Sequence, residues 1–275
     1  MATKADELRR LHHGPPILVL PNAWDAASAR LFEAEGFPAI ATTSAGVAAS
    51  LGYPDGAVAP AREMVEAIAR IARAVRVPVT ADIEHAYATT PSDVAEVVLR
   101  TIAAGAVGVN IEDYLPGADG LVPVSVQVDK IAAVVKAAAK AGVPVVVNAR
   151  TDGCLRALDA PDARIDHAIA RGRAYLAAGA DCVFVPGVRD RDDIARLVRG
   201  IGGPINVLAV SGSPPIADLE AIGVARVSVG SGPMRASLAV ARDVARELKT
   251  RGTYEAFTSR ALAYDEVNEL MKPRD

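Results

Sequence analysis

Short apolar runs alternate with longer segments of helical period along most of this chain. A strand of a parallel sheet is covered on both faces and appears as a near-continuous apolar run, so each run predicts one strand. Between consecutive runs, apolar residues recur with the period of about 3.6 residues that is typical of an amphipathic helix. This alternation predicts a parallel sheet. The expected strands are 17–21, 39–43, 77–83, 107–112, 144–150, 182–186, 205–210 and 226–230.

The strand and helix units follow one another without a linker or a shift in composition. The chain has 275 residues, close to the roughly 250 of a (β/α)8 barrel. An open doubly wound sheet is the alternative, but it would carry a glycine-rich phosphate turn after its first strand, where this chain has PNAWDA. We therefore predict an α/β fold, a (β/α)8 TIM barrel. It forms one domain over 1–275, with the barrel at about 15–249 and one C-terminal helix at about 253–272.

Composition narrows the kind of protein. Apolar residues make up 51% of the chain and aromatic residues 4%, so the core is built mainly from Ala, Val, Ile and Leu. The net charge of −3 contains no block of like charge, which argues against a nucleic-acid or membrane surface. Cys154 and Cys182 are too few for a disulfide framework. With no signal-like or membrane-spanning apolar run, we expect a soluble, cytoplasmic protein.

Three carboxylates stand where two neighbouring predicted strands end. Asp82 and Glu84 are two residues apart in VPVTADIE, which would place both side chains on one face of a strand. Glu112 ends the next strand. Three neighbouring carboxylates repel one another unless a cation neutralises them, and Mg²⁺ uses a few carboxylates while keeping several waters. We expect an Mg²⁺ site, with helix capping or pairing to arginine as the alternative.

An arginine and a small-residue turn supply positive groups beside these acids. Arg150 ends the strand in NARTD, where its planar fork could bind a carboxylate bidentately. The alternative is an ion pair at the barrel rim with Asp152 or Asp113. In TTSAGVAAS the small residues allow a ligand to approach backbone N–H groups. Asn206 and Ser228, on the last two strands, either reach the site or satisfy polar groups in the core.

Five short motifs connect the chain to a known family. PNAWD, TTSAGVAASLGYPD, ADIE, NIED and NARTD follow in this order at the spacing of barrel strands. In these motifs the chain resembles the isocitrate lyase/phosphoenolpyruvate mutase superfamily, from roughly Leu20 to Ala239. The resemblance implies an Mg²⁺ ion that binds a 2-oxo acid or its enolate at the barrel mouth. It also implies a homo-oligomer, a tetramer or dimer, whose subunits exchange C-terminal helices.

The resemblance assigns roles to most of the candidate residues, and the positions of Asn206 and His85 in the sequence add these two. The expected metal ligands are Asp82, Glu84 and Glu112 directly and Asp55 through water. The expected substrate-binding residues are Thr43, Ser44, Ala45, Asp82, Arg150 and Asn206. The expected catalytic residues are Arg150, Glu112 and His85.

The chain departs from the family at the segment that supplies the proton. Lyases of this family carry a cysteine on a lid after the fourth strand, within a Lys-x-Cys-Gly-His type motif. The corresponding stretch here, 114–127, has no Cys, Lys, Arg or His. The substitute proton carriers are His85, Tyr87, Tyr114 and Cys154. His85 has the most suitable pKa, although strand alternation would point it away from Asp82.

The leading hypothesis is an Mg²⁺-dependent lyase that binds a small 2-oxo acid or dicarboxylate. It would make or break a carbon–carbon bond through an enolate. Two alternatives stay open at this stage. One is a phosphonopyruvate or oxaloacetate hydrolase, or a phosphonomutase-like enzyme; the other is a 2-oxo-acid-binding protein with little or no turnover.

Overall fold

The parallel sheet of this protein closes on itself. The computed structural model describes residues 3–158 and 160–272. Strand β1 (Leu18–Leu20) pairs with the last strand, β9 (Arg226–Ser228), and strand β2 (Asn22–Ala23) pairs with β3 (Ile40–Thr42). A single residue, Pro21, separates β1 from β2, so the two are halves of one barrel strand. The closure confirms the (β/α)8 barrel and excludes the open doubly wound sheet.

The remaining strands follow in chain order around the barrel, each parallel to its neighbours. All eight predicted strands are present, mostly shortened at their ends because pairing stops where the chain turns toward the next helix. The strands between β3 and β9 are β4 (Val79–Asp82), β5 (Gly108–Glu112), β6 (Val146–Arg150), β7 (Cys182–Phe184) and β8 (Ile205–Leu208).

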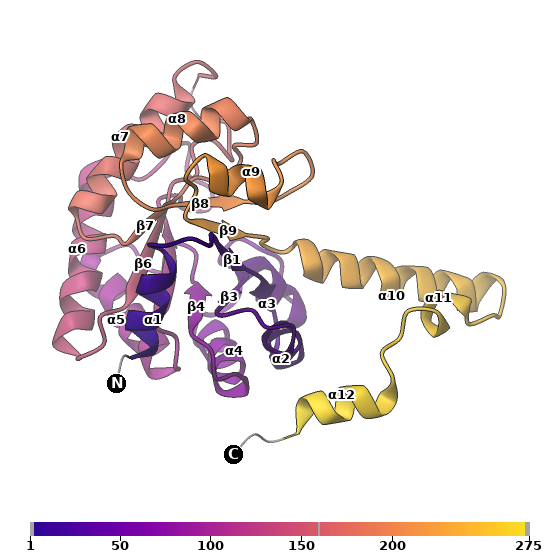
Figure 1. Cartoon of the computed structure of the whole chain (residues 1–275). Helices are drawn as coiled ribbons and strands as arrows, with labels where there is room; N and C mark the ends of the chain where they lie inside the picture. Colours follow the sequence, from indigo (N-terminus) through magenta and orange to yellow (C-terminus); the bar gives the residue numbers. More distant parts are fainter. Residues whose placement is uncertain (1–2, 159, 273–275) are drawn as a thin grey trace.

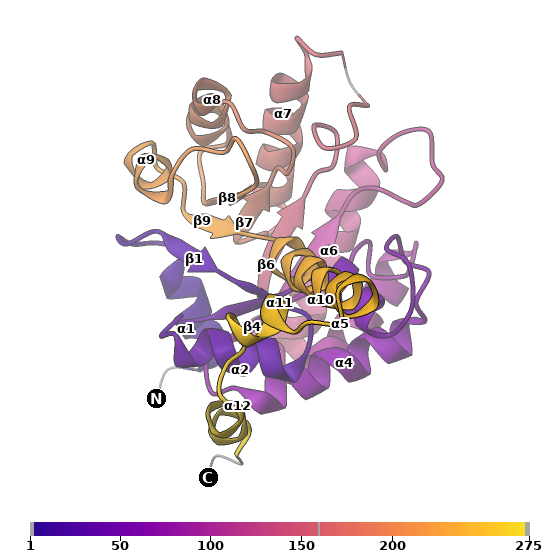
Figure 2. The ribbon, with the colours of Figure 1, turned by 90° about the vertical axis from the view of Figure 1, so that its right-hand side faces the viewer.

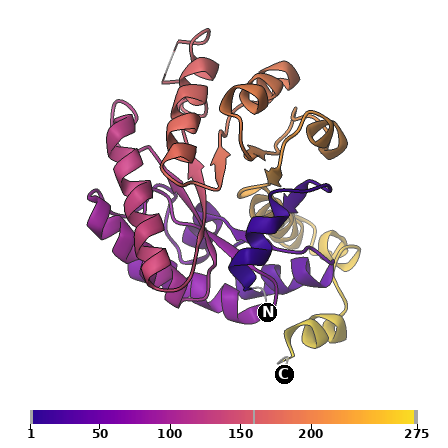
Figure 3. The same ribbon diagram turned by 60° about the vertical axis from the view of Figure 1, so that its left-hand side comes forward.

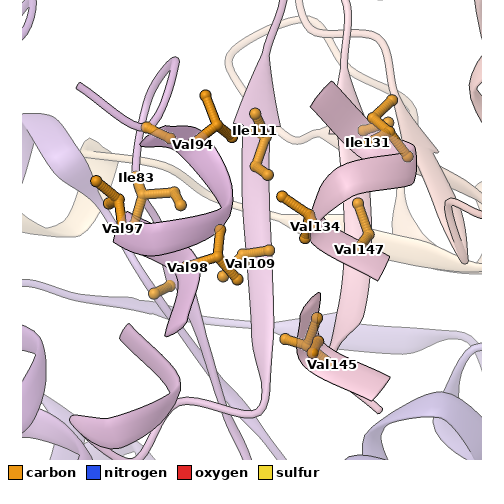
Figure 4. Close-up of a cluster of buried hydrophobic side chains, with 14 of the residues drawn as sticks. Ile83, Val94, Val97, Val98, Val109, Ile111, Ile131, Val134, Val145 and Val147 are labelled. Atoms are coloured by element: carbon orange, nitrogen blue, oxygen red, sulfur yellow. The ribbon is translucent and has the colours of Figure 1, made fainter. Parts of the chain in front are cut away.

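Helices surround the strands in a ring (Figure 3). Apolar side chains of β-branched residues fill the space between strands and helices, as Figure 4 shows where Val94, Val98, Ile131 and Val134 gather beside Val109. The helices of the ring are α2 (Ala26–Ala34), α4 (Ala61–Ala74), α5 (Pro91–Ala103), α6 (Val124–Lys140), α7 (Arg164–Ala177), α8 (Arg191–Ile201) and α9 (Ile216–Ala221), with the short α3 (Ser44–Ser50) after β3.

Helix α1 (Lys4–Leu11) closes the amino end of the barrel. Its Leu8 is fully buried among residues of β1, β3 and β6. A Cβ on Gly108 would lie 2.7 Å from a methyl carbon of Leu8, so only glycine allows this close contact. Arg9 donates to Asp181 at 2.7 Å. Helix α1 thus plugs this end of the barrel interior.

The sequence pattern predicted one helix at about 253–272, but the structure has two short helices in this segment. Helix α10 (Gly232–Thr250) extends away from the barrel (Figure 1) and is followed by α11 (Glu255–Thr258) and α12 (Tyr264–Met271). Helix α12 lies beside α2 (Figure 2), where Arg30 donates to the carbonyl oxygen of Leu270 at 3.0 Å. None of the helices in the described part of the chain is both long and apolar enough to cross a membrane.

Candidate active site

A cavity of about 190 Å³ opens where the barrel strands end. It reaches from the mouth, at Ser44 and Arg150, down to Thr80 and Arg226 inside the barrel. Its wall brings together seven of the residues expected from the sequence: Thr43, Ser44, Ala45, Asp55, Asp82, Arg150 and Asn206. The expected residues Glu84, Glu112 and His85 do not belong to this wall.

Asp82, the last residue of β4, is held by neutral donors on two sides. Ser44 donates to its Oδ2 through the backbone N–H at 3.0 Å and through the hydroxyl at 2.8 Å. The side-chain amide of Asn110 donates to Oδ1 at 2.9 Å, and the amide of Asn148 donates to Asn110 at 3.0 Å. We call Asp82, Asn110 and Asn148, from three adjacent strands, the amide belt. The turn after β3 therefore uses these donors of Ser44 to orient a carboxylate of the protein.

Glu84 lies on a turn and not on the strand. Strand β4 ends at Asp82, the N–H of Ala86 bonds back to the carbonyl oxygen of Ile83 at 2.8 Å, and Glu84 has φ +52°. The expectation that Asp82 and Glu84 share a strand face is thus wrong, because the strand ends at Asp82 and the chain turns over residues 83–86. Glu84 is nevertheless buried near the other acids. Burial, followed by repulsion from Asp82 and Asp55, raises the pKa of Glu84 to about 7.

Glu112 pairs with Arg150 beside the cavity. The distance from its Oε2 to Nη1 of Arg150 is 2.9 Å. Burial raises the pKa of Glu112 well above its ordinary value, although the positive charge of Arg150 opposes the shift. Burial and then Glu84, Asp82, Glu112 and Asp55 raise the pKa of Tyr87. Several carboxylates thus act on one small region.

This excess of negative charge fits a hard divalent cation. The part of the chain that the structure describes contains no group of three His, Cys, Asp or Glu side chains that could hold a metal ion directly. The three-carboxylate ligand set expected from the sequence is therefore not formed, because Glu84 leaves the strand and Glu112 turns to Arg150. Mg²⁺ commonly binds through one or two carboxylates and keeps several waters. The donor set around Asp82 fits that mode of binding.

Arg150 is engaged by protein carboxylates on all three nitrogens. Nε and Nη2 donate to the two oxygens of Asp152 at 2.5 and 2.9 Å, and Nη1 faces Glu112. The rim ion pair with Asp152, which the sequence left open, is present. These two carboxylates raise the pKa of Arg150 against the effect of its burial. At most one N–H on each Nη nitrogen remains for a ligand.

None of the four candidate proton carriers lines the cavity. His85 is buried, and burial followed by the charge of Lys130 lowers its pKa. The ring of Tyr114 lies 3.5 Å from the guanidinium carbon of Arg156. Cys154 lines a separate depression with Arg164 and Asp190.

Sequence reasoning missed several polar residues of the cavity wall, among them Thr80, Asn110 and Arg226. Arg226 is the first residue of β9 and is 3% exposed. The alternation in RVSVG contained the signal, since Arg226 lies two residues before Ser228 and shares its face. An arginine on the inner face of a barrel strand needs a polar interior, and the amide belt provides one.

A closed parallel barrel with acids and an arginine at the carboxyl ends of its strands is the typical architecture of a barrel enzyme. The family model described as phosphoenolpyruvate phosphomutase matches residues 8–249. The chain belongs to this family, within the phosphoenolpyruvate mutase/isocitrate lyase superfamily, and is an enzyme of lyase type.

The matches to individual relatives cover most of the chain. An uncharacterised protein of Mycobacterium tuberculosis is 42% identical over 86% of this chain and 86% of its own length. The oxaloacetate decarboxylase of Rhodopseudomonas palustris is 33% identical over 84% of this chain and 79% of its own length. A solved structure of phosphonopyruvate hydrolase with oxalate and Mg²⁺ is 27% identical, with a TM-score of 0.86, and the match covers 98% of this chain and 95% of that one.

Proposed function

We propose that this protein is an Mg²⁺-dependent enzyme that cleaves a carbon–carbon bond of a small 2-oxo dicarboxylate by decarboxylation, with oxaloacetate as the model substrate. The observation that carries the proposal is the composition of the cavity wall. Among the described residues, that wall contains Asp, Arg, Asn, Ser and Thr but no Cys, His, Lys or Tyr. The oxaloacetate decarboxylases among its relatives support the same reaction.

Decarboxylation suits this wall because it needs no base from the protein. An aldol-type cleavage requires a base that takes the hydroxyl proton of the substrate and an acid that protonates the enolate. In decarboxylation the C3–C4 bond breaks, its electron pair forms the C2–C3 enolate, and CO₂ leaves. The enolate carbon C3 then takes a proton from water, which gives a 2-oxo monocarboxylate. Solvent can thus supply the proton that the lid segment 114–127 lacks.

The residues of the site would divide the work as follows. Asp82 would hold Mg²⁺ directly, and Glu84, Glu112 and Asp55 would hold it through water. When bound, the ion supplies positive charge to the 2-oxo acid oxygens. Ser44 and Asn110 fix the orientation of Asp82.

The rim of the cavity would position and protect the bond that breaks. Arg150 would direct its remaining N–H groups at the substrate, with its charge balanced by Asp152 and Glu112. Leu155, Phe184, Pro186 and Leu208 also line the cavity, and their apolar surface would exclude water from the leaving carboxylate.

The test is product analysis on the full-length protein with Mg²⁺. Oxaloacetate should be converted to pyruvate and CO₂, and NMR measures the rate. The rate should exceed that with Mg²⁺ alone and that of an Asp82→Asn variant. Phosphonopyruvate and a mixture of glyoxylate and succinate serve as alternative substrates. Turnover of either one but not of oxaloacetate would replace decarboxylation with hydrolysis or an aldol-type reaction. Ligand binding without any product would leave a binding protein.

We also propose a homo-oligomer formed through the C-terminal helices and a cytoplasmic location. Helix α10 leaves the barrel with Leu238 56% exposed, and Tyr264 on α12 is 81% exposed. Further exposed apolar residues on this arm are Leu248, Tyr254, Phe257 and Leu262. Such an apolar surface is typical of a contact between subunits. The two free thiols, Cys154 and Cys182, fit a reducing compartment.

A further inference from the structure

Asp113 is a fully buried carboxylate that follows Glu112 at the end of β5 and does not belong to the cavity wall. Its Oδ1 accepts the backbone N–H of Asp152 at 3.0 Å. Its own backbone N–H donates to the carbonyl oxygen of Arg150 at 3.2 Å. This one residue therefore holds the backbone of both members of the Arg150–Asp152 ion pair, on either side of Thr151.

A tyrosine and an arginine of α7 hold the other oxygen of this carboxylate. The hydroxyl of Tyr175 donates to Oδ2 of Asp113 at 2.7 Å, and Nη1 of Arg171 donates to the same oxygen at 3.1 Å. Arg171 also donates to the hydroxyl oxygen of Tyr175 at 3.0 Å. The two side chains share one face of α7 because they are four residues apart. Helix α7 thus fixes the orientation in which Asp113 accepts from Asp152.

Asp181 makes the same kinds of contact to β6 at the opposite end of the barrel. Its Oδ2 accepts the backbone N–H of Val147 at 2.8 Å, and its Oδ1 accepts from Nε of Arg9 at 2.7 Å. Neither Val147 nor Arg9 lines the cavity. Asp113 and Asp181 therefore both join a backbone N–H of this part of the chain to an arginine, but of the two only Asp113 contacts Arg150.

We propose that Asp113 is a positioning residue of the active site, which sets where the guanidinium of Arg150 lies. Nε and Nη2 of Arg150 are bound to Asp152, so the direction of the remaining N–H groups depends on where Asp152 lies relative to β6. A displacement of about 1 Å at a group that positions a substrate can cost about 100-fold in rate. The proposal rests on the proposed function, because it takes Arg150 as the group that binds the substrate.

The experiment compares wild type, Asp113→Asn and Asp181→Asn by calorimetric titration with oxalate in the presence of Mg²⁺. Both variants should have a lower melting temperature, because each leaves an arginine without its carboxylate. We expect the oxalate affinity of Asp113→Asn to fall by about 10- to 100-fold, the range seen for groups that orient the ligands of a metal site. Asp181→Asn should stay within about twofold of wild type. Equal affinities in the two variants would overturn the positioning role, since destabilisation alone would then account for Asp113.

Tyr175→Phe tests the same chain of contacts without changing any charge, and stays informative where Asp113→Asn does not fold. It removes one donor to Asp113 and leaves Arg171 in place. Loss of one hydrogen bond corresponds to about a 2- to 10-fold change, and we expect a loss of oxalate affinity in this range. Wild-type affinity in Tyr175→Phe would show that the orientation of Asp113 does not reach the ligand, and would overturn the proposal.

Crystal structures of the ligand-free variants test the geometry without reference to any reaction. Asp113→Asn should show Arg150 displaced from its place beside Asp152, and Asp181→Asn should show this pair unchanged. An unmoved Arg150 in Asp113→Asn would overturn the positioning role.

Turnover of oxaloacetate separates this inference from the proposed reaction. Asp113→Asn should raise KM, whereas a residue with a merely structural role would lower the melting temperature and leave the KM of the folded protein unchanged. Wild type that does not decarboxylate oxaloacetate, while Arg150 is displaced in Asp113→Asn, would refute the reaction alone. Wild type that decarboxylates while Asp113→Asn keeps its KM would refute the positioning role alone.

Discussion

Arg150 donates through both Nε and Nη2 to the carboxylate of Asp152, two residues further along the chain, at 2.5 and 2.9 Å. Asp152 is fully buried and also accepts from Arg156 at 3.0 Å. Asp152→Asn would remove one of the two carboxylates that balance the buried charge of Arg150 and leave Glu112 as the other. We expect a loss of about 3–5 kcal/mol in the free energy of unfolding, measured with urea.

The control for this change is Asp166→Asn. Asp166 also pairs with an arginine, Arg196, at 3.1 Å, but its side chain is 68% exposed. Exposed ion pairs contribute about 0–1 kcal/mol. Equal losses in the two variants would show that burial does not decide the strength of the Arg150–Asp152 pair.

Asp82→Asn should remove Mg²⁺-dependent turnover while preserving the fold. Asparagine keeps an acceptor for Ser44 but loses the charge that a hard cation requires. We expect a fall in kcat of more than about 100-fold, the scale seen when one group that stabilises transition-state charge is removed, and a matching loss of Mg²⁺ affinity in a calorimetric titration. EDTA should abolish the wild-type activity, and added Mg²⁺ should restore it. Asp243→Asn on α10 is the control, and full activity of Asp82→Asn would refute the metal site.

His12 should make the protein less stable in acid. Burial, then the charge of Arg226, lowers the pKa of His12 to about 3, against about 6.5 in an unfolded chain. Between these values the unfolded chain binds a proton that the folded chain does not. The stability from neutral His12 is therefore present above pH of about 6.5 and is lost as the pH falls toward about 3.

The measurement is urea unfolding between pH 7.5 and pH 4.5 for wild type, His12→Gln and His13→Gln. His12→Gln should show a flatter decline of stability with acid than wild type. His13 is exposed and its substitution serves as the control. Parallel declines in all three proteins would exclude His12 as a source of the acid sensitivity.

Gly187, which follows β7, contacts the loop after β6, where Leu155 lines the cavity. Gly187→Ala should therefore disturb that loop. Gly187 has φ +91°, and a Cβ there would lie 2.6 Å from the Cα of Leu155. The strain should lower the free energy of unfolding by about 1–3 kcal/mol and raise KM, because Leu155 would move. Gly120→Ala, with no atom within 4 Å of the added methyl, should change neither quantity. A normal KM in Gly187→Ala would mean that Leu155 does not shape the site.

Leu238→Glu should dissociate the proposed oligomer. The substitution places a charge on the exposed apolar surface of α10, where a subunit contact would bury it. Light scattering after size exclusion should give the monomer mass for this variant and a multiple of it for wild type. Ile216→Glu, at an exposed apolar position on α9, should keep the wild-type mass. Identical masses for wild type and Leu238→Glu would contradict assembly through α10.

Much of the fold could be predicted from the sequence because the barrel strands are short apolar runs separated by helical segments of regular length. The prediction was wrong at the C-terminus, where the apolar stripe of 253–272 continues through a break between α11 and α12. The pattern shows which residues seek burial but not whether the chain between them bends. The division of the first strand at Pro21 was likewise visible only in the pairing of β1 and β2.

The sequence predicted which residues lie in the site better than it predicted how those residues pair with one another. Strand ends converge in any parallel barrel, so the sequence alone could predict that Asp82, Arg150 and Asn206 lie in one site. The partners of Arg150 and the departure of Glu84 from the strand depend on local turns of a few residues. Arg226 was overlooked because the amide belt makes the interior of this barrel polar, and no single strand reveals that.

The two side-chain amides of the amide belt, Asn110 and Asn148, have the same orientation, and each depends on the one before it. Asp82 only accepts hydrogen bonds, so Asn110 must turn its NH₂ group toward Asp82 and its oxygen toward Asn148, which then turns its NH₂ group the same way. A donor in place of Asp82 would favour reversal of both amides together, since each orientation dictates the next. The identity of one side chain at the mouth therefore sets whether Asn148, two strands away, shows an oxygen or an amino group to the middle of the barrel.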